Sequence, residues 1–163
     1  MSLSLVAFSE YIKNKYYQVH GENIMRDNVI RITESFQDTV LTSAQMDTLN
    51  ATPVSLVPAP GSGLVNIVTG VYVEVTPGST PFELGSGVLE VRYTDGSGSK
   101  VITDIANAVV ESASLAKGWN PPIVCVPVSN AAIVAHTSAD VTAGDGSVKF
   151  RVFYKTVLSS ELA

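Results

Sequence analysis

The most constraining feature of this sequence is a series of short, valine-rich segments in which apolar and polar side chains alternate. The clearest segment, residues 64–75, has one apolar face, made by Val65, Ile67, Val71, Val73 and Val75. A period of two is typical of a β-strand with one buried side. The pattern returns at residues 88–94, 99–104 and 148–157, with turns rich in Gly, Pro and Asp between the segments.

Seven or eight such strands without long helices between them predict an all-β fold, an antiparallel β-sandwich of jelly-roll-like topology. Residues 123–128 and 131–136 are continuous apolar runs, which predicts strands buried on both faces. In the last strand, the expected inward side chains are Val148, Phe150, Val152 and Tyr154, and the expected outward ones are Lys149, Arg151 and Lys155.

Two short helical stretches interrupt the strand pattern. Thr42 as N-cap and Gln45 three positions later form a capping box, which predicts a two-turn helix that ends before Pro53. Residues 107–117 are less regular, and we expect a helical turn there that ends at Gly118.

Composition changes near residue 40, which predicts an N-terminal arm over residues 1–40 and a β-sandwich domain over residues 41–163. The arm has no Pro and one of the 12 Gly residues. Phe8, Tyr11, Ile12 and Tyr16 follow helical spacing and predict one short amphipathic helix, and residues 29–33 alternate as a strand would. So short a helix is marginal alone in water, so it must pack on its own β domain or on a neighbouring chain. The sequence leaves both arrangements open.

The charge of the chain argues against several classes of partner. The net charge is -5 and the pI is near 4.9, the opposite of what a phosphate-tracking groove needs, so we expect no nucleic-acid binding. No apolar run approaches the ~20 residues of a membrane span. Charged residues make up only 15% of the chain, against about 25% in a typical domain. A surface with so little charge is expected where other chains cover part of it.

A search for catalytic chemistry finds no nucleophile, base or metal set, so we expect no enzyme activity, no cofactor and no metal. Cys125 is expected to be a small buried hydrophobe, and the two histidines lie far apart. Asp95 and Asp145 sit in glycine-rich turns without the other ligands of a calcium loop.

Glutamates and one tryptophan are the remaining candidates for a site. A carboxylate pair could form in space from Glu74, Glu83, Glu90 and Glu111, although Glu74 and Glu90 have the alternation of solvent-facing strand residues. Trp119 is either a sugar-stacking platform, a binding anchor or a side chain packed on the sandwich edge.

Residues 41–63 carry a resemblance to a known group of proteins. They read Leu-Thr-Ser-Ala-Gln-Met-Asp-Thr-Leu-Asn-Ala-Thr-Pro-Val-Ser-Leu-Val-Pro-Ala-Pro-Gly-Ser-Gly, followed by the long valine-rich strand. This helix, strand and turn resemble those of small β-sandwich proteins encoded by tailed bacteriophages and prophages. The similarity is strong over about residues 40–75 and continues only as a pattern to residue 157. The resemblance implies a structural protein of the virion, of the capsid-decoration (cement) type, and transfers no catalytic residues.

The sequence therefore predicts a decoration protein that binds the major capsid protein as a homo-oligomer, expected to be a trimer. It would lie on the capsid surface of the virion after assembly in the host bacterial cytoplasm, without contact with nucleic acid or membrane. We expect Phe8, Tyr11, Ile12, Tyr16 and Tyr17 to anchor the arm to a neighbouring subunit or the shell. The alternative is a receptor-binding or tail-tip module that recognises a host ligand, with Trp119 and Tyr72 exposed and clustered.

Overall fold

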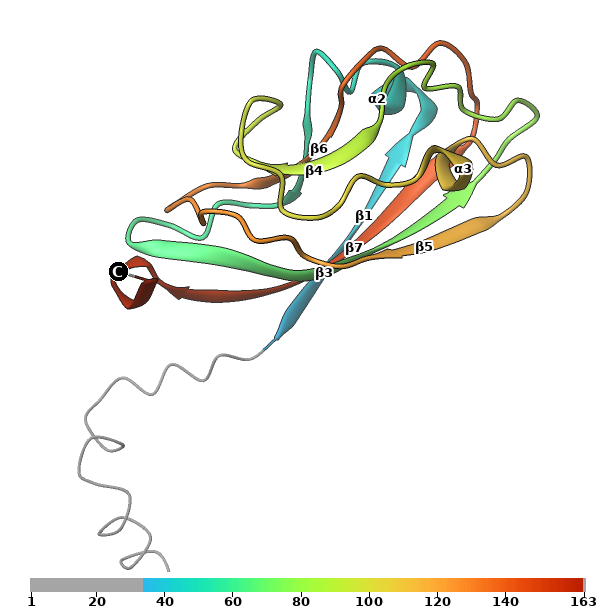
Figure 1. The fold of residues 1–163 in the computed structure, drawn as a ribbon. Coiled ribbons are helices and arrows are strands. Elements are labelled where there is room, and N and C mark those ends of the chain that lie inside the picture. The colour runs from blue at the N-terminus through green and yellow to red at the C-terminus, as the bar shows by residue number, and fades with distance from the viewer. Residues whose placement is uncertain (1–33, 163) are drawn as a thin grey trace, which may run out of the picture. The chain divides into compact units, whose positions relative to one another are not determined.

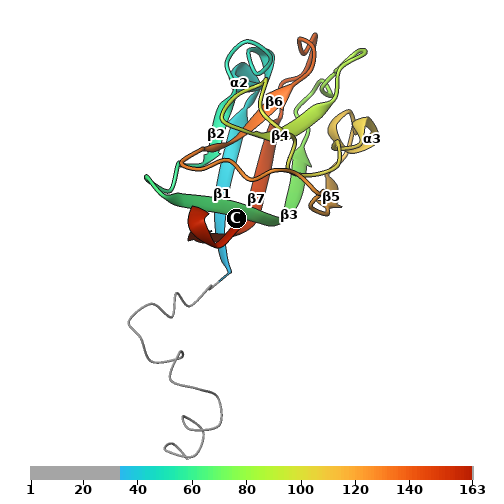
Figure 2. The ribbon, with the colours of Figure 1, turned by 60° about the vertical axis from the view of Figure 1, so that its left-hand side comes forward.

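The computed structural model describes residues 34–162, which form two antiparallel β-sheets packed face to face. Figure 1 shows the sheets as two layers, and Figure 2 shows the strands of the larger sheet side by side. This sheet has four strands in the order β1-β7-β3-β5. Their bounds are β1 (Ser35–Thr42), β7 (Ser147–Leu158), β3 (Leu64–Thr76) and β5 (Ala116–Asn120).

The smaller sheet has the order β2-β6-β4, with β2 (Val54–Val57), β6 (Ile133–Thr137) and β4 (Leu89–Tyr93). Residues 99–105 run along the outer edge of β4. Val101 N donates to Val91 O at 2.9 Å and Ile105 N donates to Leu89 O at 3.0 Å. This segment therefore takes the fourth position of the smaller sheet, although its pairing is limited to isolated bridges.

The connectivity is that of a jelly roll. When residues 99–105 are counted as a strand and the eight segments are numbered in chain order, the strand order is 1-8-3-6 in the larger sheet and 2-7-4-5 in the smaller one. Two sheets built this way from eight antiparallel strands define the jelly roll. The predicted all-β, jelly-roll-like sandwich is thereby confirmed.

The core lies between the sheets and is built from the inward side chains of both. Val71, Val73 and Val75 of β3 are fully buried, and so is Phe150 of β7. β6 is buried along its whole length, as its continuous apolar sequence predicts. Tyr93 crosses the interior, where its hydroxyl donates to Asn66 O at 2.6 Å.

Two short helices lie in the connections between strands. Helix α2 (Ser43–Asp47) begins with the predicted capping box, in which Thr42 and Gln45 bond reciprocally, and buries Met46. Helix α3 (Asn107–Val110) is the expected helical turn, and a 3₁₀ helix, η2 (Ser159–Leu162), follows β7. Within residues 34–162, no helix has the length and apolar character needed to cross a membrane.

The strand predicted at residues 123–128 is wrong. These residues form no strand, and Val124 and Val126 are exposed rather than buried. The physical reason is proline: Pro121, Pro122 and Pro127 have no N–H to give to a sheet. Ile123 N, at the start of this stretch, donates to Val101 O at 3.1 Å.

The larger sheet differs from the sequence-based expectations in three further ways. β3 has a bulge between Val68 and Gly70, so Val68 enters the core while Ile67 remains half-buried. One extra residue in a strand shifts the alternation of inward and outward side chains by one position on one side of the bulge.

Strand β5 has no local signal in the sequence. It pairs with β3 over the stretch that was expected to end a helical turn. β1 starts at Ser35, so the sheet includes residues 35–40, which composition places in the arm.

Candidate interaction surface

The outer side of the four-stranded sheet carries a row of exposed aromatic rings. Phe36 of β1 and Phe153 of β7 are cross-strand partners with ring centroids 6.2 Å apart. The Trp119 ring of β5 lies 5.5 Å from Phe153 on the other side. Phe36 and Trp119 are 58% and 56% exposed, so the row ends in two large apolar side chains open to solvent. Tilted pairs at these distances stabilise each other by about 0.5–1.5 kcal/mol.

Gly70 explains why the indole can reach Phe153. Gly70 is the β3 partner of Phe153, and a Cβ placed on it would lie within 2.3 Å of two Trp119 ring carbons. The absence of a side chain therefore lets the indole lean across β3 onto Phe153. A glycine inside a strand often marks such a close approach.

A second row, of polar side chains, runs beside the aromatic one. Arg151 donates two hydrogen bonds to Asp38, both at 2.7 Å, while its guanidinium lies 4.7 Å from the centre of the Phe36 ring. The hydrogen bonds from Arg151, with a smaller contribution from Lys149, lower the pKa of Asp38 from 3.8 to about 2. The bidentate bond and the cation–π contact together hold Arg151 flat against Phe36.

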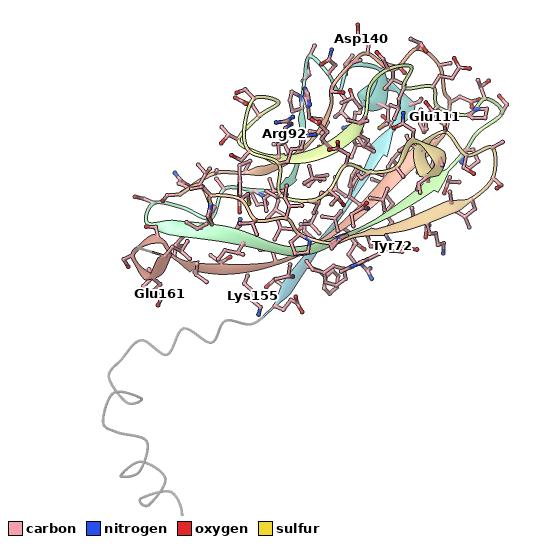
Figure 3. The ribbon with its side chains drawn as sticks, viewed as in Figure 1. Tyr72, Arg92, Glu111, Asp140, Lys155 and Glu161 are labelled. Atoms are coloured by element: carbon pink, nitrogen blue, oxygen red, sulfur yellow. The ribbon has the colours of Figure 1, made fainter. Side chains whose placement is uncertain are left out.

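A third row completes this side of the sheet with charged residues. Lys117 pairs with Glu74 at 3.2 Å, and the Tyr72 hydroxyl donates to the same carboxylate at 3.4 Å. Figure 3 shows Tyr72 and Lys155 on the side of the sheet that faces away from β4 and β6. We call this whole surface the aromatic face; its members are Phe36, Asp38, Val40, Tyr72, Glu74, Lys117, Trp119, Lys149, Arg151, Phe153 and Lys155.

Charge is unevenly distributed between this face and the rest of the domain. Residues 34–162 contain six Lys and Arg and twelve Asp and Glu, and four of the six cations lie on the aromatic face. The face has two carboxylates, Asp38 and Glu74, and a net charge of +2. The remainder of the described residues has a net charge of -8.

The other two cations surround one buried carboxylate on the smaller sheet. Glu90 is 2% exposed and contacts Arg92 at 2.6 Å, Lys100 at 2.7 Å and His136 at 3.3 Å. Burial opposes the ionisation of Glu90, but hydrogen bonds from Arg92 and Lys100 outweigh it and lower its pKa. The expectation of a solvent-facing Glu90 is therefore wrong, because these side chains and the turn above them cover it.

The four glutamates considered for catalysis do not converge on one site. Glu83 and Glu111 line one open pocket of 470 Å³, where Glu111 already accepts a hydrogen bond from Leu84 N at 2.9 Å. Glu74 lies on the aromatic face and Glu90 lies on the smaller sheet. Across residues 34–162, no three His, Cys, Asp or Glu side chains are arranged to hold a metal ion.

The turn aspartates have the structural role that the sequence predicts, whereas Cys125, which was expected to be buried, is half-buried. Asp95 accepts from Ser97 N at 2.8 Å, and Asp145 accepts from Thr80 N at 2.7 Å. Cys125 packs against the core, and burial raises the pKa of its thiol. Free thiols in apolar surroundings are poorly reactive.

Of the predicted interaction residues, Trp119 lies at one end of the aromatic face. The other five, Phe8, Tyr11, Ile12, Tyr16 and Tyr17, lie outside the residues that the structure describes. Sequence reasoning missed Phe36 and Phe153. Alternation along the last strand gave the signal for Phe153, since it shares a side with Arg151, but no local pattern pairs it with Phe36, more than a hundred residues away.

Comparisons with known proteins find distant structural similarity. No protein-family model matches the chain, and no curated protein matches it. One similar structure is from the cyanophage Pam1 capsid asymmetric unit: TM-score 0.46, 16% identity, covering 76% of this chain and 83% of the other. Another is from the acidic stable capsid of Helicobacter pylori bacteriophage KHP30: TM-score 0.48, 19% identity, covering 77% and 93%. At these values neither match assigns a family to the chain.

Proposed function

We propose that this chain is a structural protein of a tailed-phage virion that decorates the outer surface of the capsid shell and stabilises it through oligomeric contacts. The aromatic face carries the proposal, because a rigid sheet surface with exposed Trp and Phe side chains is built for contact with another macromolecule. The resemblance of residues 41–63 to small phage virion proteins supports the same role. In the fold, those residues form α2, β2 and the turn into β3.

The proposed partners are the major capsid protein and further copies of this chain, as a trimer. A decoration protein covers joints between shell subunits, and shell symmetry favours a symmetric oligomer at those joints. The proposal assigns no catalytic step and no cofactor. It does not derive from the jelly roll alone, since that fold also occurs in lectins and cupins.

The direct test mixes the purified full chain with undecorated capsids and pellets the capsids. We expect the chain to co-sediment and to reach a fixed number of copies per capsid as its concentration rises. Absence from the pellet at every concentration would reject a decoration role.

The aromatic residues of the arm are proposed as anchors on the neighbouring subunit or the shell. Deleting residues 1–22 removes Phe8, Tyr11, Ile12, Tyr16 and Tyr17 together and leaves β1 intact. We expect the shortened chain to lose capsid binding or oligomer size while its melting temperature stays unchanged. Unchanged binding and unchanged size would show that the arm is no anchor.

A second candidate function is recognition of a host surface ligand. The observation in its favour is that Trp119 is exposed and is the cross-strand partner of Tyr72. In that case the isolated chain would bind host cells or their glycans, and Trp119→Ala would abolish this binding. A chain that pellets with capsids and does not bind cells rejects this alternative.

A further inference from the structure

We propose that a second copy of this chain docks on the aromatic face, head to tail, through the acidic surface of that second copy. The inference rests on the proposed function in one respect: a decoration protein is expected to form an oligomer. It goes further by naming the surface through which the oligomer forms and the kind of symmetry that results.

The composition of the aromatic face is that of an interface centre. Trp, Tyr and Arg are the residues most enriched at energetic hot spots, and the face brings Trp119, Tyr72 and Arg151 together on three neighbouring strands. These side chains are already held in place: Trp119 by Gly70 and Phe153, and Arg151 by Asp38 and Phe36. Docking therefore orders few side chains, which lowers its entropic cost.

The carboxylates of the aromatic face are already paired with Lys and Arg side chains, which distinguishes the face from a sugar-binding site. Carbohydrate recognition needs polar groups free to bond hydroxyls, but Asp38 is bound by Arg151 and Lys149 and Glu74 by Lys117. The neighbouring rings are tilted by 45° and 58°, so they form ridges rather than a flat platform. Ridges of this kind fit between the side chains of a protein surface.

Charge identifies the occupant as another copy of this chain. The aromatic face has a net charge of +2, whereas the rest of the described residues has a net charge of -8. The two cations outside the face, Arg92 and Lys100, are both committed to Glu90. On a second copy, Glu83 and Glu111 line one open pocket and provide an acidic surface. Its charge complements that of the face, and complementary charge favours this pairing over others.

The same charges favour a head-to-tail arrangement over a face-to-face one. A two-fold dimer would bring together two aromatic faces that both have a positive net charge. A contact between the aromatic face and a different surface is heterologous, and it closes into a ring when the rotation allows it. A closed ring is compatible with the trimer proposed above.

The experiment measures the mass of the full chain by light scattering and sedimentation over a range of concentrations. Wild type should form one closed oligomer. Phe36→Glu and Trp119→Ala should each weaken association at least about tenfold, and Lys155→Glu should weaken it and reduce its salt dependence. Val124→Ser is the matched control, because Val124 is a fully exposed apolar residue outside the face. Circular dichroism and melting temperatures verify that each variant is folded.

Salt distinguishes the two arrangements. Raising the salt concentration screens attraction between unlike charges, so a head-to-tail oligomer should dissociate more readily. An oligomer that becomes tighter with salt would indicate face-to-face packing and overturn the proposal. A wild type that stays monomeric, or folded Phe36→Glu and Trp119→Ala variants with wild-type mass, would overturn it as well.

Failure of this inference can be told apart from failure of the proposed function. Wild type that pellets with capsids while the face variants keep their oligomeric mass rejects the inference alone. An oligomer that depends on the face but never binds capsids supports the inference and rejects the decoration role.

Discussion

At the residue scale, the aromatic face depends on side chains that fix one another across strands. Asp38 holds Arg151, Arg151 covers Phe36, Phe36 packs on Phe153, and Phe153 supports Trp119. Each of the two aromatic pairs is worth on the order of 1 kcal/mol. Together they give the surface a defined shape before any partner binds, which is the property that binding requires.

Gly70→Ala tests this arrangement through the only tryptophan of the chain. The new methyl group would occupy the place of the indole edge, so Trp119 must swing away from Phe153. We expect its fluorescence emission to shift to longer wavelength. Stability should change by no more than about 1 kcal/mol, because the lost packing is offset by the better strand conformation of Ala. An unchanged emission maximum in the folded variant would contradict the position of the ring.

Glu90→Gln tests the buried carboxylate of the smaller sheet. Removing its charge leaves Arg92 and Lys100 without their shared partner, so we expect a loss of about 2 kcal/mol in urea unfolding at pH 7. Because the pKa of Glu90 is lowered in the folded state, its contribution is present above its ordinary pKa of 4.5 and is lost as pH falls through the lowered value. The difference between variant and wild type should therefore shrink at pH 3.

The control for this measurement is Glu74→Gln. Glu74 is also an outward-facing glutamate of a strand, but its side chain is 29% exposed and its Lys117 partner is 52% exposed. We expect a change below about 0.5 kcal/mol. Equal losses in the two variants would show that the burial of Glu90 has no energetic role.

At the element scale, the sequence predicts the elements whose signals are local and misses those set by other segments. The capping box of α2 and the alternation of β7 depend on neighbours in the chain, and both predictions are confirmed. The bulge in β3 and strand β5 are not encoded locally, because they exist through pairing with distant strands. At residues 123–128, the apolar composition predicted a buried strand, but the prolines prevent these residues from pairing in a sheet.

Thr42→Ala tests the local signal that starts α2. The Thr42 hydroxyl accepts from Gln45 N, and the Gln45 side chain accepts from Thr42 N at 3.0 Å. Losing the first of these bonds should lower stability by about 1 kcal/mol in thermal or urea unfolding. Ser43→Ala, one residue later, should have almost no effect, since the Ser43 side chain makes no hydrogen bond to another residue within 34–162. Equal effects at both positions would contradict a capping role for Thr42.

At the scale of the whole molecule, the aromatic face could not have been predicted from the sequence. Its rows join β1, β7, β3 and β5, and their register is fixed only when strands from both ends of the chain are paired. Phe36 and Phe153 look like two unrelated aromatics until β1 lies beside β7. The sequence could identify Trp119 as unusual, but it could not place Gly70 and Phe153 beneath and beside it.

The position of β7 gives a last prediction about folding. This strand is the last of the chain, yet it lies inside the larger sheet between β1 and β3. A chain that ends at Gly146 lacks β7 and leaves the inner edges of β1 and β3 unpaired, so we expect it to show no cooperative unfolding transition.

A chain that ends at Leu158 keeps β1 to β7 and loses only η2, whose residues are exposed or half-buried. Its free energy of unfolding should therefore fall by about 1 kcal/mol or less. Since the sheet closes through contacts between the two ends of the chain, refolding of the longer variant should take milliseconds to seconds in stopped-flow fluorescence. Cooperative unfolding of the shorter chain would show that β1 and β3 do not need β7 between them.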